Sequence, residues 1–233
     1  YISCAFRLAC SHDSMVSSRR SVASAFAARL IVMAKEPKAG VVKRRLASGI
    51  GAAAAVRFYR TTLRHTLMRV SAYPRWQTYL AVTPDASLSA SCWPGLPRIP
   101  LLPQNEGDLG QRMQHLFDVA PPGPAVIIGS DIPAITAQHV AEAFERLGNA
   151  DAVFGPAEDG GYWLVGLRRR PGRLAPFDGV PWSMDRALAV TRQNLRGRSV
   201  ALVDRLSDVD TAEDFKSQRR FAERLVLPRD HLA

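Results

Sequence analysis

Short apolar runs alternate along the chain with longer stretches in which apolar residues recur every three or four positions. Short apolar runs bounded by Gly, Pro and Asp are typical of buried strands, whereas the three-to-four spacing predicts helices. The predicted strands are residues 30–34, 77–82, 99–102, 125–130, 151–155, 162–167 and 199–203. The predicted helices are residues 52–70, 108–119, 136–147 and 184–195, with a further helix from residue 211 onward.

This alternation of strands and helices predicts the fold class. Strand–helix–strand units place strands side by side in parallel and lay the helices over both faces of the sheet. We therefore expect an α/β protein with three α/β/α layers and a mostly parallel, mixed sheet. The strand at 99–102 is expected at or near an edge, because its prolines cannot donate ladder hydrogen bonds.

The first residues of the chain differ from the rest. Residues 1–28 are rich in Ser, Ala and Arg, contain one acidic residue, Asp13, and show no strong period. A transit peptide, a disordered leader and a translated upstream stretch all share this composition. We exclude this segment from fold reasoning and expect residues 29–233 to form a single domain, since neither a linker nor an internal repeat interrupts them.

The composition is that of a globular protein with a basic balance. A hydrophobic content of 47% predicts a sizeable core, and 31 basic against 21 acidic residues give a formal charge of +10. Such a charge attracts polyanions, including nucleotides, sugar phosphates and nucleic acids. The basic residues are dispersed and no aromatic-rich basic face accompanies them, which argues against nucleic acid as the partner.

Cysteine usage and hydropathy indicate the compartment. The three cysteines, Cys4, Cys10 and Cys92, form neither a CxxC motif nor a Cys/His metal pattern, so the simplest interpretation is a reduced, cytoplasmic protein. No apolar stretch approaches the ~20 residues that a membrane helix needs, so we expect no membrane segment.

Asp131 is the most informative residue of the sequence. It follows the apolar run at 125–130 and precedes Ile132-Pro133, which places a carboxylate at the carboxyl end of a buried strand. Open α/β sheets bind their ligands at this edge. The alternative is a turn or helix N-cap, but Thr136 is the better N-cap for the following helix.

A basic loop follows the first strand, where nucleotide-binding α/β folds place their phosphate loop. It contains Lys35, Gly40, Lys43 and Arg45, and its cations and backbone amides suit phosphate oxygens. Neither GxxxxGK[ST] nor GxGxxG is present. A solvated basic loop is the alternative.

Three further polar segments each have a structural alternative. Gln104 to Met113 enters a helix with Asp108 as a plausible N-cap, and its glycines would permit close approach of a ligand to the backbone. Asp159-Gly160-Gly161 lies between two strands and could be a hairpin turn. In Asp208 to Phe215, capping by Thr211 or Asp210 could account for the pattern.

Taken in order, these motifs resemble a known family. They are Ala34-Lys35, Gly40-Val41-Val42-Lys43, Arg45-Leu46, Gly107-Asp108-Leu109-Gly110, Ile128-Gly129-Ser130-Asp131, Gly155-Pro156-Ala157-Glu158-Asp159-Gly160-Gly161-Tyr162, Pro181-Trp182-Ser183 and Asp208-Val209-Asp210-Thr211. The sequence resembles the bacterial glycosyltransferase-like proteins called radical-SAM/selenodomain-associated transferase 1. The resemblance implies the GT-A, nucleotide-diphospho-sugar transferase fold, which is Rossmann-like and related to molybdenum-cofactor and phospholactate guanylyltransferases.

The resemblance also implies a divalent metal, Mg²⁺ or Mn²⁺, that bridges the phosphates of a nucleotide to carboxylates. Asp131 matches the metal aspartate of the fold, and the late DxD-like motif points to Asp210 as the second ligand, with Asp208 beside it. A hard cation that keeps several waters needs only one or two protein carboxylates.

The remaining roles follow from the same resemblance. Lys35, Lys43 and Arg45 would hold the phosphates, and Lys43 and Asp131 would take part in catalysis. Asp159 would be a general base or a further metal ligand. The nucleotide side would also include Gly40, Gln104, Gly107 and Asp108. The acceptor side would be lined by Gly160, Gly161, Tyr162, Trp182 and Ser183.

Two reactions remain open. The glycosyltransferase-like character of the family favours glycosyl transfer from a nucleotide sugar to a small-molecule acceptor. The Lys/Arg loop favours nucleotidyl transfer from an NTP to a phosphorylated small molecule with release of pyrophosphate, because it resembles the triphosphate-binding loop of the guanylyltransferases. A non-catalytic protein that binds nucleotide or nucleic acid is the further alternative.

Overall fold

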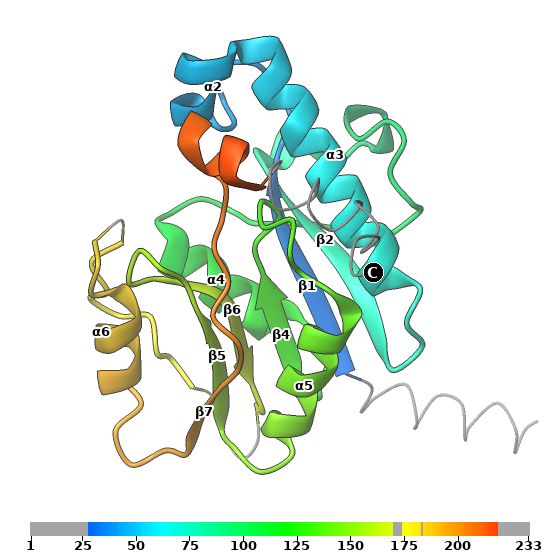
Figure 1. Cartoon of the computed structure of the whole chain (residues 1–233). Helices are drawn as coiled ribbons and strands as arrows, with labels where there is room; N and C mark the ends of the chain where they lie inside the picture. The colour runs from blue at the N-terminus through cyan, green and yellow to red at the C-terminus, as the bar shows by residue number, and fades with distance from the viewer. Residues whose placement is uncertain (1–27, 170–173, 183, 219–233) are drawn as a thin grey trace, which may run out of the picture.

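The alternating strands and helices form, in the computed structural model, one seven-stranded sheet with helices on both faces (Figure 1). The structure describes residues 28–169, 174–182 and 184–218. The predicted leader lies outside these residues except for Ala28, which begins β1. The strands are β1 (Ala28–Lys35), β2 (Trp76–Thr83), β3 (Leu101–Pro103), β4 (Ala125–Ile128), β5 (Ala152–Pro156), β6 (Tyr162–Leu167) and β7 (Val200–Leu202). The helices are α2 (Arg44–Ile50), α3 (Ala52–Ser71), α4 (Leu109–Val119), α5 (Ala137–Leu147) and α6 (Ala187–Gln193), with the short 3-10 turns η1 (Asp85–Ser87) and η2 (Ala90–Cys92).

The sheet is mixed and mostly parallel, as the sequence predicts. Its strand order is β3-β2-β1-β4-β6-β5-β7. β6 pairs antiparallel with both β4 and β5, and the other neighbouring strands are parallel. A short connection can join only antiparallel strands, so the turn from Ala157 to Gly161 reverses the chain between β5 and β6. The proline-containing β3 lies at one edge, as expected.

Two apolar clusters fill the space between the three layers. On one face, Tyr59, Leu63 and Leu67 of α3 and Val140 of α5 pack against the sheet. On the other face, the apolar side of α4 does so, through Met113, Leu116 and Phe117. The helical spacing of these residues is what made the helices predictable. Within the described residues, none of the helices combines the length and apolarity needed to cross a bilayer.

Side-chain caps fix where three helices begin. Asp108 caps α4 and Thr136 caps α5, each through a reciprocal capping box with the residue three positions on. The backbone amide of Asp214 donates to Thr211 Oγ1 at 3.2 Å, and Asp214 Oδ2 accepts from the amide of Thr211 at 2.8 Å. This pair caps the helix at residues 212–218. All three caps agree with the sequence prediction.

The segment after the first strand differs from the prediction. The predicted basic loop includes Arg45, but α2 begins at Arg44, so the loop ends earlier. α2 has seven residues, no acidic residue in its first turn and no side-chain cap, and Leu46 is its one buried residue. It therefore lacks both the periodicity and the start signal that identify a helix. The predicted helix at 184–195 is likewise shorter, since α6 spans Ala187–Gln193.

A third, smaller cluster joins the end of the described chain to α2 and α3. Val209 is fully buried against Leu46 and Ala55. Phe215 meets Phe58 edge to face, with ring centroids 5.3 Å apart. Figure 1 shows the helix at residues 212–218, in orange-red, beside α2. This packing fixes the position of the Asp208–Asp210 segment relative to the basic loop.

Candidate functional site

The candidate site lies at the carboxyl ends of β1 and β4. These strands are parallel neighbours in register from Arg29 and Ala125 to Val32 and Ile128, so the segments that follow them emerge at the same edge. Lys35 ends β1, and Asp131 stands three residues beyond the end of β4. Topology alone therefore brings the basic loop and the aspartate together, as expected for a ligand edge of an α/β sheet.

Lys43 lies at the centre of the site. Its Nζ lies 2.8 Å from Asp131 Oδ2, 2.6 Å from Asp210 Oδ1 and 3.8 Å from Asp208 Oδ2. The Lys43 side chain is 4% exposed, whereas the three carboxylates are 36–42% exposed. One buried ammonium thus ties together three carboxylates from two distant parts of the chain.

The backbone of Lys43 adopts an unusual conformation. Its φ of 49° and ψ of 48° lie in the left-handed region, at the N-cap of α2. A non-glycine residue there costs about 1–2 kcal/mol, and such residues concentrate at functional sites. The ion pairs with Asp131 and Asp210 offset this cost and hold the ammonium in place.

The buried side chain of Val209 positions the acidic motif Asp208-Val209-Asp210 at the site. Val209 points into the core and is fully buried, so its neighbours Asp208 and Asp210 project from the other side of the extended segment. One oxygen from each of Asp131, Asp208 and Asp210 lies within 4.8 Å of the others. Oxygen ligands of a divalent cation stand at about 2.0–2.6 Å from it, so this spacing fits a divalent cation.

The charges of the cluster shift the pKa values of two of its members, Lys43 and Asp208. Burial acts to lower the pKa of Lys43, but the carboxylates of Asp131 and Asp210 outweigh it and raise that pKa above its ordinary value. Burial, together with the charge of Asp210, raises the pKa of Asp208 to about 6. The ammonium is therefore held charged, and Asp208 takes up a proton more readily than an ordinary aspartate.

A cavity of about 540 Å³ opens on the basic side of the cluster. Its lining includes Lys35, Lys43, Arg45 and Gln104, which the sequence assigned to phosphate or nucleotide binding. Arg44 and Asp210 line it as well. Gln104 is nearly buried and donates from Nε2 to the carbonyls of Ala34 and Ala81, so it also ties β1 to β2.

Three residues assigned to nucleotide binding do not line this cavity. Gly40 adopts a positive φ of 76° with open space around it. Gly107 has a φ of 108°, and a Cβ there would meet the side chain of Gln111. Asp108 is engaged in the capping box of α4. Turn geometry and capping account for the placement of all three in this structure.

Tyr59 of α3 is a site residue that the sequence reading missed. Its hydroxyl donates to the carbonyl of Lys35 at 3.1 Å, accepts from the amide of Lys35 at 2.9 Å and lies 3.1 Å from Ser130 Oγ. Burial raises the pKa of Tyr59 to about 12, so this hydroxyl stays protonated. Tyr59 lies on the apolar face of a predicted helix, where its hydroxyl needs a hydrogen-bond partner. That need was the feature of the sequence that could have pointed to this residue.

A second cavity of about 330 Å³ lies on the other side of Asp131. The acceptor-side residues Gly161, Tyr162 and Trp182 line it, together with Asp159. The rings of Tyr162 and Trp182 meet edge to face with centroids 6.3 Å apart, and burial raises the pKa of the Tyr162 hydroxyl. Ser183, also assigned to the acceptor side, lies outside the described residues.

Gly160 does not line this cavity, and its requirement is structural. Its φ is 81°, and a Cβ there would clash with the carbonyl oxygen of Asp185. The carbonyl of Gly160 accepts from the amide of Leu188 at 3.1 Å, which joins the β5–β6 turn to α6. Only glycine fits this position.

The two cavities share one wall. Met33, Leu109, Gly129 and Asp131 line both of them. Asp210 faces the basic cavity and Asp208 the other. A cation held by the three carboxylates would therefore lie at the boundary between the cavities.

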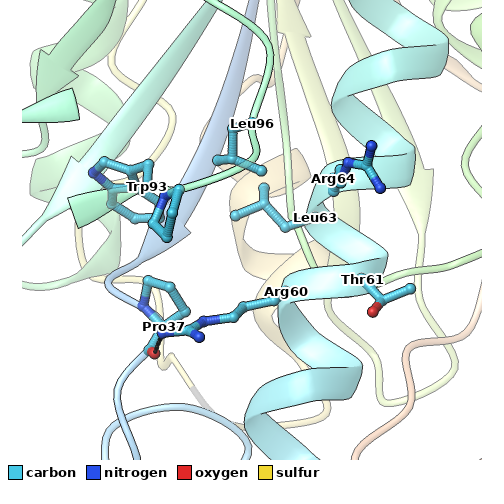
Figure 2. A pocket seen from close by; sticks show the side chains of 8 residues that line it. Pro37, Arg60, Thr61, Leu63, Arg64, Trp93 and Leu96 are labelled. Carbon is cyan, nitrogen blue, oxygen red and sulfur yellow. Dashed lines mark hydrogen bonds between the residues drawn. The ribbon is translucent and has the colours of Figure 1, made fainter. Parts of the chain in front are cut away.

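A smaller cavity of about 110 Å³ lies apart from the carboxylates (Figure 2). It is bounded by Pro37, by Arg60 and Leu63 of α3, and by Trp93 and Leu96. Figure 2 shows Arg60 reaching toward Pro37, whose carbonyl accepts from Arg60 Nη2 at 3.2 Å. This contact fastens the basic loop to α3.

The chain is similar to a bacterial protein family and to a guanylyltransferase. A family model described as an uncharacterised protein conserved in bacteria, DUF2064, matches residues 66–184. A 2-phospho-L-lactate guanylyltransferase of Methanopyrus kandleri is 29% identical over 177 residues, which are 74% of this chain and 82% of that protein.

Solved structures carry the same fold. A proposed nucleotide-diphospho-sugar transferase from Desulfovibrio desulfuricans G20 superposes with a TM-score of 0.75 at 27% identity, covering 87% of this chain and 90% of that one. A Mycobacterium tuberculosis H37Rv protein in complex with manganese has a TM-score of 0.50 at 16% identity, covering 82% of this chain and 97% of that one. The expected α/β fold of the nucleotide-diphospho-sugar transferases is confirmed.

Proposed function

The chain belongs to the DUF2064 family of bacterial proteins, and from that premise we propose that it is a metal-dependent transferase that uses a nucleotide-activated donor. The group transferred is a glycosyl group, passed from a nucleotide sugar to a small-molecule acceptor. One observation carries this proposal: a buried lysine and three carboxylates stand at the boundary between a basic cavity and a cavity lined by apolar and acidic side chains.

The basic cavity suits the donor. Lys35, Lys43, Arg44 and Arg45 surround its volume of about 540 Å³, within the range of small-ligand sites. Arginine and lysine side chains form charge-assisted hydrogen bonds with phosphate oxygens. The tie between Tyr59 and the backbone of Lys35 fixes the start of this loop, so the cations are held ready for the ligand.

The acidic cluster suits a divalent cation on the donor phosphates. Asp131, Asp208 and Asp210 would hold Mg²⁺ or Mn²⁺, whose positive charge would stabilise the negative charge that develops on the leaving phosphate. Lys43 contacts all three carboxylates in this structure. A cation bound to these carboxylates would replace the ammonium there, and Lys43 would then be free to turn toward the donor phosphates.

The second cavity suits the acceptor. Asp159 lines it, and its carboxylate would accept the proton of an attacking hydroxyl. Tyr162 and Trp182 would hold the body of the acceptor against β6. Asp131 borders both cavities, so donor and acceptor would meet beside it.

Nucleotidyl transfer is the second candidate. The 29% identical relative from Methanopyrus kandleri is a guanylyltransferase, which favours reaction of an NTP with release of pyrophosphate. The same basic cavity and the same carboxylates would serve that reaction, because both donors carry phosphates next to a nucleoside.

The identity of the leaving group tests the proposal. Binding of nucleotide sugars and NTPs to the purified protein is first measured with Mg²⁺ or Mn²⁺. Each radiolabelled donor is then incubated with the protein, the metal and a pool of hydroxyl-bearing and phosphorylated small-molecule acceptors, and the products are separated. Release of a nucleoside diphosphate from a nucleotide sugar supports glycosyl transfer, and release of pyrophosphate from an NTP supports the second candidate. If no nucleotide sugar or NTP binds with either metal, both candidates are wrong.

A further inference from the structure

The acceptor-side cavity is distinguished by the charge of its lining. Asp131, Asp159 and Asp208 are the charged residues among its described lining residues, which include no Lys, Arg or His. The basic cavity beside it is lined by Lys35 and three other cations. The two halves of the site thus have opposite electrostatic character across one shared wall.

The cation site accounts for only part of this acidity. Asp131 and Asp208 contact Lys43, and the proposed metal would neutralise their remaining charge together with that of Asp210. Asp159 has no ion-pair partner among the described residues, and its Oδ1 accepts a hydrogen bond of 2.9 Å from the amide of Gly161. One uncompensated carboxylate therefore faces the cavity even in the metal-bound protein.

The rest of the lining is apolar and in part adaptable. Met33, Met113 and Met184 contribute flexible thioether side chains, and Trp163 and Trp182 contribute flat aromatic surfaces. Met184 is 56% exposed, so its side chain has room to move against a ligand. Such walls suit a ligand with an apolar or ring-shaped body.

From this lining we infer that the acceptor is an uncharged or positively charged small molecule with an apolar body, and that the cavity rejects phosphorylated and other anionic acceptors. That this ligand is an acceptor rests on the proposed function. The charge preference of the cavity does not depend on that function. An anion would meet the carboxylate of Asp159 with no described cation in the lining to offset it. A hydroxyl or ammonium group would instead donate to that carboxylate.

Three probes with one body and different charges test the charge preference. Benzyl alcohol is neutral, benzylamine is cationic and benzyl phosphate is anionic at neutral pH. Each is titrated into the full chain labelled with fluorotryptophan, with and without Mg²⁺, and binding is followed by fluorine NMR. The chain has 4 tryptophans, so each probe can be located. Trp163 and Trp182 line the acceptor-side cavity, whereas Trp93 lines the small cavity of Figure 2.

We expect saturable shifts at Trp163 and Trp182 with benzyl alcohol and benzylamine. Benzyl phosphate is expected to bind about threefold to tenfold more weakly, because its negative charge would be repelled by the exposed carboxylate of Asp159, which water screens in part. The inference is overturned if benzyl phosphate binds there as tightly as benzyl alcohol. It is also overturned if the neutral and cationic probes shift neither tryptophan, or shift only Trp93.

A matched pair of variants assigns the preference to one carboxylate. Asp159→Asn should weaken benzylamine binding about threefold to tenfold and narrow its advantage over benzyl phosphate. Glu158→Gln removes one negative charge from the neighbouring exposed position and should change neither value. Equal effects of the two variants would contradict the role of Asp159. Nucleotide binding is measured separately in the same samples, so failure of the proposed function and failure of this inference are distinguishable.

Discussion

Replacing Lys43 with methionine tests how the site is held together. The substitution keeps the length of the side chain and removes its charge, which leaves three carboxylates within 4.8 Å of one another without their shared ammonium. At an effective dielectric constant of about 20, unit charges 2.6–2.8 Å apart attract by roughly 6 kcal/mol before desolvation is counted. Desolvation of the ions cancels much of this, and breaking a buried pair costs about 3–5 kcal/mol.

The expected loss for Lys43→Met is smaller than the fully buried case. The three carboxylates are 36–42% exposed, so water takes up part of the lost interaction and we expect a loss of about 2–3 kcal/mol. For a chain of this size that corresponds to a fall in Tm of about 5–10 °C. Because a divalent cation would replace the missing charge, Mg²⁺ or Mn²⁺ should stabilise the variant more than the wild type.

The assay is thermal unfolding followed by circular dichroism, in EDTA and in saturating Mg²⁺ or Mn²⁺. Arg75→Met is the control, because Arg75 pairs with Glu145 at 3.2 Å and the two side chains are 53% and 57% exposed. An exposed pair contributes about 0–1 kcal/mol, so this control should unfold near the wild-type temperature. The reasoning is refuted if Lys43→Met unfolds in EDTA within about 1 °C of the wild type, or if metal stabilises both proteins equally.

Three further predictions follow from single residues. The pKa of Asp208 is raised to about 6, so the metal-free site holds a proton below that pH. Because this proton competes with the metal, the Kd for Mg²⁺ measured by calorimetry should fall as pH rises through about 6 and then level off. Gly160→Ala should cost more than about 3 kcal/mol in denaturant unfolding, because its Cβ meets a backbone carbonyl, whereas Gly179→Ala, with positive φ but open space, should cost about 1 kcal/mol. Tyr59→Phe leaves the amide of Lys35 without its partner and should cost about 1–3 kcal/mol while weakening nucleotide binding. A nucleotide Kd unchanged from the wild type would contradict that role of Tyr59.

Local signals made most of the fold predictable. The caps at Asp108, Thr136 and Thr211, the edge position of the proline-containing strand and the turn at Asp159-Gly160-Gly161 all follow from nearest neighbours in sequence. α2 escaped prediction because a seven-residue helix with one buried side chain has no measurable period. Short elements of this kind are fixed by tertiary packing.

The site was predictable in its membership and less so in its arrangement. The resemblance brought Asp131, Asp208 and Asp210 to one site, and the structure places them together. It did not predict that Lys43 would lie among them, because that contact depends on a left-handed backbone and on a partner 167 residues away. The same resemblance assigned Gly160 to the acceptor side. Its constraint is the carbonyl of Asp185, which no local pattern reveals.

Asp131 is proposed to help hold a divalent cation on a nucleotide donor. The most direct measurement is the Kd of nucleotide sugars and NTPs, with Mg²⁺ and with EDTA, for the wild type, Asp131→Asn and the exposed control Asp178→Asn. We predict that Mg²⁺ tightens binding to the wild type and to the control by about tenfold or more, or about 1.4 kcal/mol, and that Asp131→Asn abolishes this gain. Metal-dependent binding that survives unchanged in Asp131→Asn would contradict the account.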